Sequence, residues 1–253
     1  MAYCKNDDDI ELTAQVFDEE QLRACEKELV RTIYIPANLI SAVRREGIKY
    51  VVVLPEICDD DKKIQIPENF GVLISNVGQG MMYGGYEKYG NSRLNVFNSY
   101  SLKCFEDYQS VTLSSELNLK EIAKVGGTVR KEIVSYGKIP LMIMKNCPVK
   151  SVTGKCSKNG GYYLRDRKNE EFKMVCDGYC HSVILNSKNI YMADKIADIK
   201  KSGVNRVRLN FYDESCEETL NVIREYKNAL KGESIDKKPE NTFTRGHFYR
   251  GVL

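Results

Sequence analysis

The chain has 253 residues, of which 38 are Lys or Arg and 35 are Asp or Glu, so its formal net charge is +3. A charge this small creates no global field that would indicate nucleic-acid binding, so any such function must rest on local patches. No apolar run approaches the roughly 18 residues that cross a bilayer, and no signal-peptide pattern opens the sequence. We therefore expect a cytoplasmic protein without a membrane partner.

Strand-like and helix-like segments alternate along the first half of the chain. Strand patterns lie at residues 10–16, 32–36, 50–55, 71–76, 93–99 and 110–116. Helical patterns follow at residues 19–29, 38–45, 99–108 and 117–125. Such alternation is typical of α/β folds, in which parallel strands are joined by helices.

Two glycines follow the predicted strand at residues 71–76. The segment Val77-Gly78-Gln79-Gly80 lies at the carboxyl end of this strand, where glycines can cradle a phosphate. No P-loop lysine follows, and the spacing is not that of a dinucleotide fingerprint. A plain strand-to-helix turn is therefore the favoured interpretation.

The regular alternation breaks after Gly126 and Gly127. Two apolar runs, at residues 128–135 and 139–144, are joined by too few residues for a parallel crossover, so we expect a hairpin or one irregular run. The second run has the length and apolar content of a strand buried on both faces. The pattern is completed by a helix at 189–201, a strand at 205–211 and a helix at 215–230.

About eight strands separated by helices favour an α/β fold of the (β/α)8 TIM-like barrel type. We assign residues 1–231 to this barrel, with an irregular part near 128–144 and a cysteine-rich loop at 145–181. Residues 232–241 have the composition of a flexible linker, and residues 242–253 form a basic, aromatic tail with too little apolar content to fold alone.

Three polar side chains end predicted barrel strands, at Asn76, Asn98 and Glu116. A barrel presents its functional groups at the carboxyl ends of its strands, because side chains from several strands converge there. We predict that Asn98 and Glu116 are catalytic and that Asn76 contributes to substrate binding.

Four of the nine cysteines lie within 34 residues, at Cys147, Cys156, Cys176 and Cys180. In a chain expected in a reducing compartment, this clustering indicates metal or redox chemistry instead of disulfides. The spacing fits an iron–sulfur cluster better than structural zinc, because zinc sites use two tight cysteine pairs and only the second pair is tight here. Unliganded thiols are an equal alternative, and for His181 a surface or hydrogen-bonded histidine is favoured over a ligand.

The segment between the cysteines combines aromatic and basic side chains. Tyr163 offers a stacking face, and Arg165 and Arg167 offer forked N–H donors. This combination suits a nucleotide phosphate or base, so we predict that these residues bind substrate. A charged β-turn is an equally good interpretation.

Six strings resemble sequences of the peptidase U32 family, also called the collagenase-like protease family. They are LNVFNS (94–99), LSSELNL (113–119), YGKIPLMIMKNCP (136–148), YYLRDRK (162–168), ILNSK (184–188) and FTRGHFYRG (243–251). More narrowly, the chain resembles the C-terminal barrel of the long members, which carry another such barrel upstream. An upstream U32 barrel or a paralogous subunit is therefore an expected partner.

The resemblance implies a chemistry for the cysteines. Other members resemble oxygen-independent hydroxylases that hold a four-cysteine [4Fe-4S] cluster, and that modify C5 of pyrimidines in transfer or ribosomal RNA with prephenate as oxygen source or act in ubiquinone synthesis. By this resemblance the predicted cluster ligands are Cys147, Cys156, Cys176 and Cys180, and the expected partner is tRNA or rRNA.

Two other functions stay open. The family name implies a peptidase, although neither a Ser/His/Asp set nor an HExxH pair is visible in the sequence. The chain could also be a non-catalytic module that binds RNA or a partner, if the chemistry belongs to the upstream barrel of the long members. Zinc and no cofactor are the alternatives to the iron–sulfur cluster.

Overall fold

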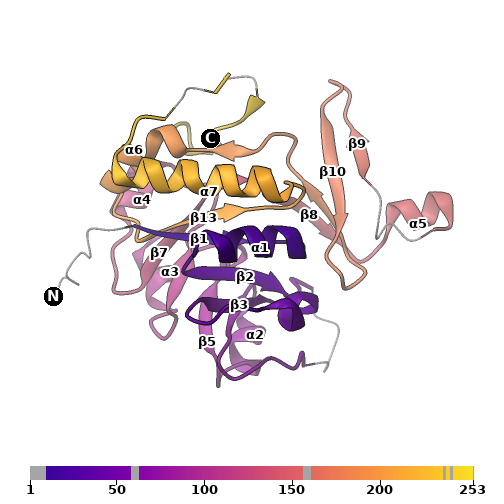
Figure 1. Cartoon of the computed structure of the whole chain (residues 1–253), viewed down its shortest axis with the longest axis horizontal. Coiled ribbons are helices and arrows are strands. Elements are labelled where there is room, and N and C mark those ends of the chain that lie inside the picture. Colours follow the sequence, from indigo (N-terminus) through magenta and orange to yellow (C-terminus); the bar gives the residue numbers. More distant parts are fainter. Residues whose placement is uncertain (1–9, 58–62, 156–160, 236–237, 240–241, 253) are drawn as a thin grey trace.

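Parallel strands form a closed barrel within the described part of the chain, and Figure 1 shows the helices and strands in their places. The structure is a computed structural model that describes residues 10–57, 63–155, 161–235, 238–239 and 242–252. Neighbouring barrel strands pair in parallel, and β13 pairs with β1 to close the sheet, which confirms the predicted TIM-like barrel. In order around the barrel the strands are β1 (Glu11–Gln15), β2 (Thr32–Pro36), β3 (Lys49–Val53), β4 (Gly71–Ile74), β5 (Glu87–Gly90), β6 (Ser110–Thr112), β7 (Arg130–Gly137) and β13 (Arg206–Asn210).

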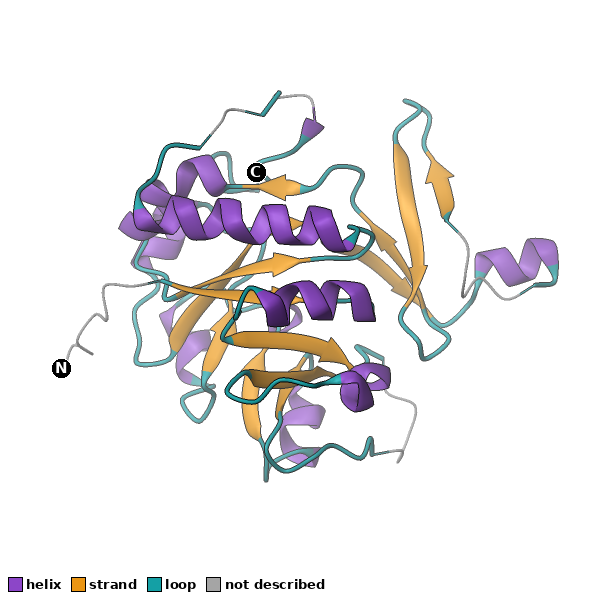
Figure 2. Ribbon diagram, in the orientation of Figure 1, coloured by secondary structure: helices purple, strands orange, loops and turns teal. Residues whose placement is uncertain are grey.

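Helices cover the outside of the barrel, and Figure 2 shows α1 and α7 side by side. The helix α7 begins at a capping box between Ser215 and Glu218, and it ends at Gly232, which has φ of 88°. No helix in the described segments is long and apolar enough to cross a membrane. The helices are α1 (Glu19–Lys27), α2 (Val77–Met82), α3 (Ser99–Lys103), α4 (Leu119–Lys124), α6 (Ile196–Lys201) and α7 (Cys216–Lys231).

Three predicted elements differ from the observed ones. The predicted strand at 93–99 is wrong, because the fifth barrel strand is β5 and Ser92–Leu94 forms a short 3-10 helix that ends at a left-handed Asn95. The predicted helix at 38–45 is a 3-10 helix over Ala37–Ala42. The predicted helix at 189–201 starts as β12 (Ile190–Tyr191), which pairs with β7, and becomes helical only afterwards.

A second, antiparallel sheet projects from the barrel (Figures 1 and 2). Its strand order is β8-β11-β10-β9, and the short helix α5 (Pro148–Thr153) follows β8. The expected hairpin between the runs at 128–135 and 139–144 is wrong, because β8 pairs with β11 and not with β7. The expectation that β8 is buried on both faces is also wrong, since Leu141 and Met142 are each 51% exposed. The strands are β8 (Pro140–Met144), β9 (Tyr162–Arg165), β10 (Glu171–Cys176) and β11 (Ser182–Leu185).

The segment that follows the predicted linker packs on the barrel. Thr244 bridges to Ile190, and its carbonyl accepts a hydrogen bond from the Tyr191 backbone N–H at 3.1 Å. Arg245 pairs with both carboxylate oxygens of Asp194, at 2.5 and 2.8 Å. Part of the predicted linker at 232–241 lies outside the described residues. The aromatic tail is therefore ordered by contacts with the barrel and not by a core of its own.

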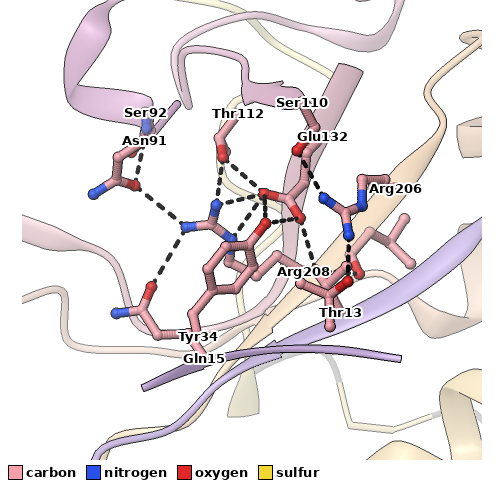
Figure 3. Close-up of polar contacts among 12 residues, drawn as sticks. Thr13, Gln15, Tyr34, Asn91, Ser92, Ser110, Thr112, Glu132, Arg206 and Arg208 are labelled. Atoms are coloured by element: carbon pink, nitrogen blue, oxygen red, sulfur yellow. Dashed lines mark hydrogen bonds and ion pairs between the residues drawn. The ribbon is translucent and has the colours of Figure 1, made fainter. Parts of the chain in front are cut away.

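The apolar core lies mainly between the strands and the outer helices, and the inside of the barrel is partly polar. Glu132 of β7 is fully buried there and forms an ion pair with Arg208 of β13 (Figure 3). Tyr34, Val51, Leu73 and Tyr89 form a small apolar cluster separate from the main core.

Hydrogen bonds from neighbouring strands complete the surroundings of Glu132. Its carboxylate accepts from Thr13 Oγ1 at 2.7 Å, Tyr34 Oη at 3.0 Å and Thr112 Oγ1 at 2.8 Å. Arg208 Nε donates to the same carboxylate at 3.0 Å. Burial alone would raise the pKa of Glu132, but the positive charge of Arg208 holds that pKa below its usual value. The ionised carboxylate thus joins β7 to β1, β2, β6 and β13.

Replacing Glu132 by Gln should destabilise the fold strongly. The substitution leaves the buried Arg208 guanidinium without its counter-charge, which typically costs about 3–5 kcal/mol of unfolding free energy. Urea unfolding of the variant at pH 7 measures this loss, and Glu106→Gln, at an exposed position, is the matched control. A loss below about 1 kcal/mol, comparable to an ordinary surface substitution, would contradict this role of the pair.

Candidate functional site

A cavity of about 260 Å³ lies at the carboxyl ends of the barrel strands. This is the end at which barrel enzymes bind their substrates. Strand ends contribute Gln15, Asn91, Ser114 and Asn210 to its lining, and the β6–α4 connection contributes Glu116. Most of these side chains are neutral amides and hydroxyls, so the cavity offers many hydrogen bonds and few unpaired charges.

Arg208 holds the amides at the floor of this cavity (Figure 3). Its Nη1 donates to Gln15 Oε1 at 3.4 Å and to Asn91 Oδ1 at 3.3 Å. Asn91 Nδ2 in turn donates to Ser75 Oγ at 3.0 Å. Because Glu132 fixes the other side of the guanidinium, the orientation of the floor depends on the buried ion pair below it.

A backbone irregularity shapes the wall beside Asn210. The register between β7 and β13 shifts between Arg208 and Leu209, and Gly137 lies opposite Asn210. Gly137 has φ of 91°, and a Cβ atom there would lie 1.8 Å from the Asn210 carbonyl oxygen. Only glycine fits this close approach, so the bulge and the glycine together set the position of Asn210.

An ion pair crosses the wall between the barrel and the second sheet. Arg93 Nε lies 2.8 Å from Glu56 Oε2, and Arg93 Nη2 donates to the Pro140 carbonyl of β8 at 3.2 Å. Burial raises the pKa of Glu56, and although Arg93 acts in the opposite direction, the pKa stays above its usual value. Glu56 can therefore hold a proton more readily than an exposed glutamate does.

A smaller cavity of about 90 Å³ continues from the first one, between the barrel mouth and the second sheet. Val53, Glu56 and Tyr212 line both cavities. The inner faces of β8, β10 and β11 add apolar side chains such as Ile143 and Val183. The second sheet therefore acts as an apolar wall over one side of the barrel mouth.

The C-terminal segment supplies another part of the rim. His247 and Phe248 line the larger cavity, and the Phe248 carbonyl accepts a hydrogen bond from the Leu119 N–H at 3.0 Å. His247 Nδ1 lies 3.2 Å from the Gly251 carbonyl oxygen. The histidine is thus held by its own segment and lies at the cavity rim.

The predicted catalytic and binding residues at strand ends have different places. Glu116 is exposed at the rim of the larger cavity. Asn98 accepts a hydrogen bond from Ser101 N at 2.9 Å and caps α3, and Asn76 accepts from Gln79 N at 3.0 Å and caps α2. Neither asparagine is among the described residues that line the two cavities. Their predicted contacts with substrate remain predictions.

The predicted phosphate-binding residues lie on a hairpin formed by β9 and β10. Tyr163 is 51% exposed, and Arg165 pairs with Glu171 across the hairpin. Arg167 lies in the connecting turn, where Asp166 accepts hydrogen bonds from the backbone of Lys168 and Glu170 at 2.7 and 2.9 Å. This geometry is that of a charged turn, displayed on the projecting sheet away from the floor of the cavity.

The cysteines fall at one end of the second sheet. The strand register aligns Cys176 with Ser182 and Ser182 with Met144, so Cys147, which follows β8, and Cys180, which precedes β11, approach the same end as Cys176. Cys156 lies outside the described residues. Among the residues that the structure does describe, no three Cys, His, Asp or Glu side chains form a group that could hold a metal ion. The described thiols share a region but do not by themselves form a ligand set.

His181 is hydrogen-bonded within the same turn. Its Nδ1 lies 2.7 Å from Asp177 Oδ2, and the side chain is buried. Asp177 Oδ1 also accepts from the backbone N–H groups of Tyr179 and His181, at 2.8 and 3.0 Å. The favoured interpretation of a hydrogen-bonded histidine matches this geometry.

Sequence analysis missed the amides of the floor and the arginine beneath them. Gln15, Arg208 and Asn210 fall inside segments that were recognised only as strands. One signal was present, because Arg206, Arg208 and Asn210 alternate with Val207 and Leu209 and must share a face of the strand. A polar face on a central barrel strand points into the barrel and, at its carboxyl end, into the site.

Comparisons with known proteins give two findings. A family model described as peptidase family U32 matches residues 87–248. The fold is similar to thiamine phosphate pyrophosphorylase from Pyrococcus furiosus, with 8% sequence identity and a TM-score of 0.47 over 88% of this chain and 96% of that one. No curated protein sequence matches the chain.

The stability of the Glu56→Gln variant relative to the wild type should increase as the pH rises. A carboxyl whose folded-state pKa is raised contributes stability that is lost as the pH increases through that pKa, and Gln mimics its protonated form. The free energy of unfolding, measured for variant and wild type at pH 4 and pH 7, should shift in favour of the variant at pH 7. An opposite shift, or none, would show that burial does not raise the pKa of Glu56.

Proposed function

The chain belongs to peptidase family U32, and from this premise we propose that it is an iron–sulfur protein for oxygen-independent hydroxylation of RNA pyrimidines, or the accessory barrel of such an enzyme. The proposal assigns substrate binding to the barrel mouth and RNA backbone binding to the second sheet. It assigns the cluster to the four clustered cysteines.

The distribution of charge is the observation that carries the proposal. Residues 140–185, which include the whole second sheet, contain eight Lys or Arg and four Asp or Glu, a net charge of +4. The rest of the chain keeps 30 basic and 31 acidic residues, a net charge of −1. The excess comes from the connection between β8 and β9, where residues 145–161 contain four lysines and no acidic residue, while the strands and turns of the sheet hold equal numbers of basic and acidic residues. A basic connection on the projecting part of the molecule, together with the exposed Tyr163 of β9 and a polar cavity at the barrel mouth, suits a polyanion whose base enters the cavity.

In this proposal Cys147, Cys156, Cys176 and Cys180 would hold the cluster. Irregular spacing does not oppose this, because four thiolates need only reach the corners of a cube. A [4Fe-4S] cluster would supply one-electron chemistry next to the barrel mouth. Glu116 at the cavity rim would contact the substrate, while Arg165 and Arg167 would bind phosphate and Tyr163 would stack on a base.

The peptidase activity in the family name is the second candidate, because Ser114, Ser115 and His247 line the same cavity. Their contacts are not those of an activated nucleophile. Ser114 Oγ accepts from Glu116 N at 3.4 Å, and His247 Nδ1 faces a backbone carbonyl. Cleavage of gelatin by the pure protein, abolished by Ser114→Ala or Ser115→Ala, would establish this candidate in place of the first.

Anaerobically reconstituted protein should be brown and hold about four irons per chain. Replacing Cys176 and Cys180 by Ala should remove the iron and the visible absorption, as measured by iron analysis and spectroscopy. Cys104→Ala is the matched control, since Cys104 is an exposed thiol on the barrel. A colourless wild-type protein, or equal iron in all variants, would contradict the cluster.

RNA binding should depend on the turn of the β9–β10 hairpin. Replacing Arg167 and Lys168 by Gln should weaken binding and reduce the slope of log affinity against log salt by about 0.7 for each lost phosphate contact. The matched control replaces Lys120 and Lys124 of α4, which removes the same charge from another face of the barrel. Filter binding over a range of salt concentrations measures both effects, and equal losses in the two double variants would contradict a specific role of the hairpin.

A further inference from the structure

Two amides on neighbouring strands form a donor and acceptor pair at the floor of the larger cavity. Gln15 of β1 and Asn210 of β13 are direct partners in the strand register, and both line the cavity. Neighbouring strands lie about 4.8 Å apart, so the two side chains leave the barrel wall side by side. Their amide groups can therefore converge on adjacent atoms of one ligand.

The orientation of each amide follows from its protein partner. Arg208 has only donors, so the Gln15 oxygen must face it, and the Gln15 amino group is left toward the cavity. The carbonyl of Lys138 only accepts, so the Asn210 amino group faces it at 3.5 Å. This leaves Asn210 Oδ1 as the free acceptor. The floor thus presents one N–H donor next to one C=O acceptor.

The acceptor has no partner within the described residues. Asn210 is only 4% exposed, and its Oδ1 is a buried oxygen without a hydrogen bond. An unsatisfied buried polar atom typically costs about 1–3 kcal/mol, and a ligand N–H placed at the floor would remove that cost. Gln15 Nε2 likewise donates to no described group. The two positions therefore favour a ligand that accepts a hydrogen bond from Gln15 and donates one to Asn210 at the same time.

The charges around the pair favour an uncharged ligand group. The Arg208 guanidinium is neutralised by Glu132, and Arg93 in the wall is paired with Glu56. Tyr212 adds an aromatic wall shared by the two cavities. Burial raises the pKa of Tyr212, so its hydroxyl stays protonated. Among the described residues that line this cavity, a phosphate would find no unpaired lysine or arginine, whereas a planar neutral ring would find hydrogen bonds and an aromatic neighbour.

We propose that Gln15 and Asn210 together bind the cis-amide or imide edge of a planar ring, with Gln15 Nε2 donating to the ring carbonyl and Asn210 Oδ1 accepting from the adjacent ring N–H. The two residues then determine specificity for a ring that carries a neighbouring C=O and N–H. The inference rests on the proposed function only for the claim that this cavity receives the substrate.

Two probes that differ by one methyl group test the pair. 1-Methyluracil retains an N–H between two carbonyls, and 1,3-dimethyluracil replaces that N–H by N-methyl. Nuclear magnetic resonance titration of the full chain should show saturable binding of the first probe and at least tenfold weaker binding of the second. Equal binding of the two probes, or no saturable binding of 1-methyluracil, would overturn the inference.

Variants separate the two hydrogen bonds. Gln15→Glu keeps an oxygen toward Arg208 and replaces only the amino group that faces the cavity, while Asn210→Leu removes the acceptor. Each should weaken 1-methyluracil binding about tenfold, whereas Glu106→Gln should not change it. Thermal unfolding identifies a variant that fails to fold. In that case the inference is tested by the comparison of the two probes on the wild-type protein alone. Unchanged affinity in both folded variants would refute the assignment.

The outcome is independent of the cluster. The probes and both variants leave all cysteines intact. If the protein stays iron-free after anaerobic reconstitution but binds 1-methyluracil, the proposed redox function is contradicted and this inference is supported. If the protein is brown and iron-loaded but binds both probes equally, the cluster is supported and this inference is contradicted.

Discussion

The buried ion pair between Glu132 and Arg208 is the constraint on which the rest of the structure depends. A charge inside a barrel is tolerated only when it is paired and fully hydrogen-bonded, and here hydroxyls from three further strands complete the shell. The same guanidinium also donates hydrogen bonds to the side chains of Gln15 and Asn91. The group that neutralises the interior therefore also orients the floor of the cavity, so stability and site geometry are coupled in one network.

The barrel mouth is completed by two parts that are not barrel strands. The second sheet forms an apolar wall through residues such as Ile143 and Val183, and the C-terminal segment brings His247 and Phe248 to the rim. The part of the chain that forms the second sheet contains the clustered cysteines and, in the connection between β8 and β9, the net positive charge, while the barrel floor carries neutral amides. In the two proposals, polyanion binding and ring recognition would lie on different surfaces, which can be altered independently.

Much of the fold could be predicted from the sequence. The ranges of β2, α1 and α7 follow apolar periodicity and capping residues, which are local properties of the chain. The errors lie where long-range pairing overrides local pattern. β8 looks like a buried barrel strand, yet it pairs with β11, and Ile190–Tyr191 becomes a strand because it finds an edge on β7.

The sequence by itself determined the α/β barrel, the family resemblance and the clustering of the cysteines, because periodicity, motifs and spacing are written in the order of residues. Only the tertiary structure decided which polar side chains share the cavity. Gln15, Asn91 and Asn210 lie up to 195 positions apart and meet because barrel closure brings β1 next to β13 and turns one face of each strand inward. No local pattern contains that information, since strand register and the direction of side chains are fixed only when the sheet closes.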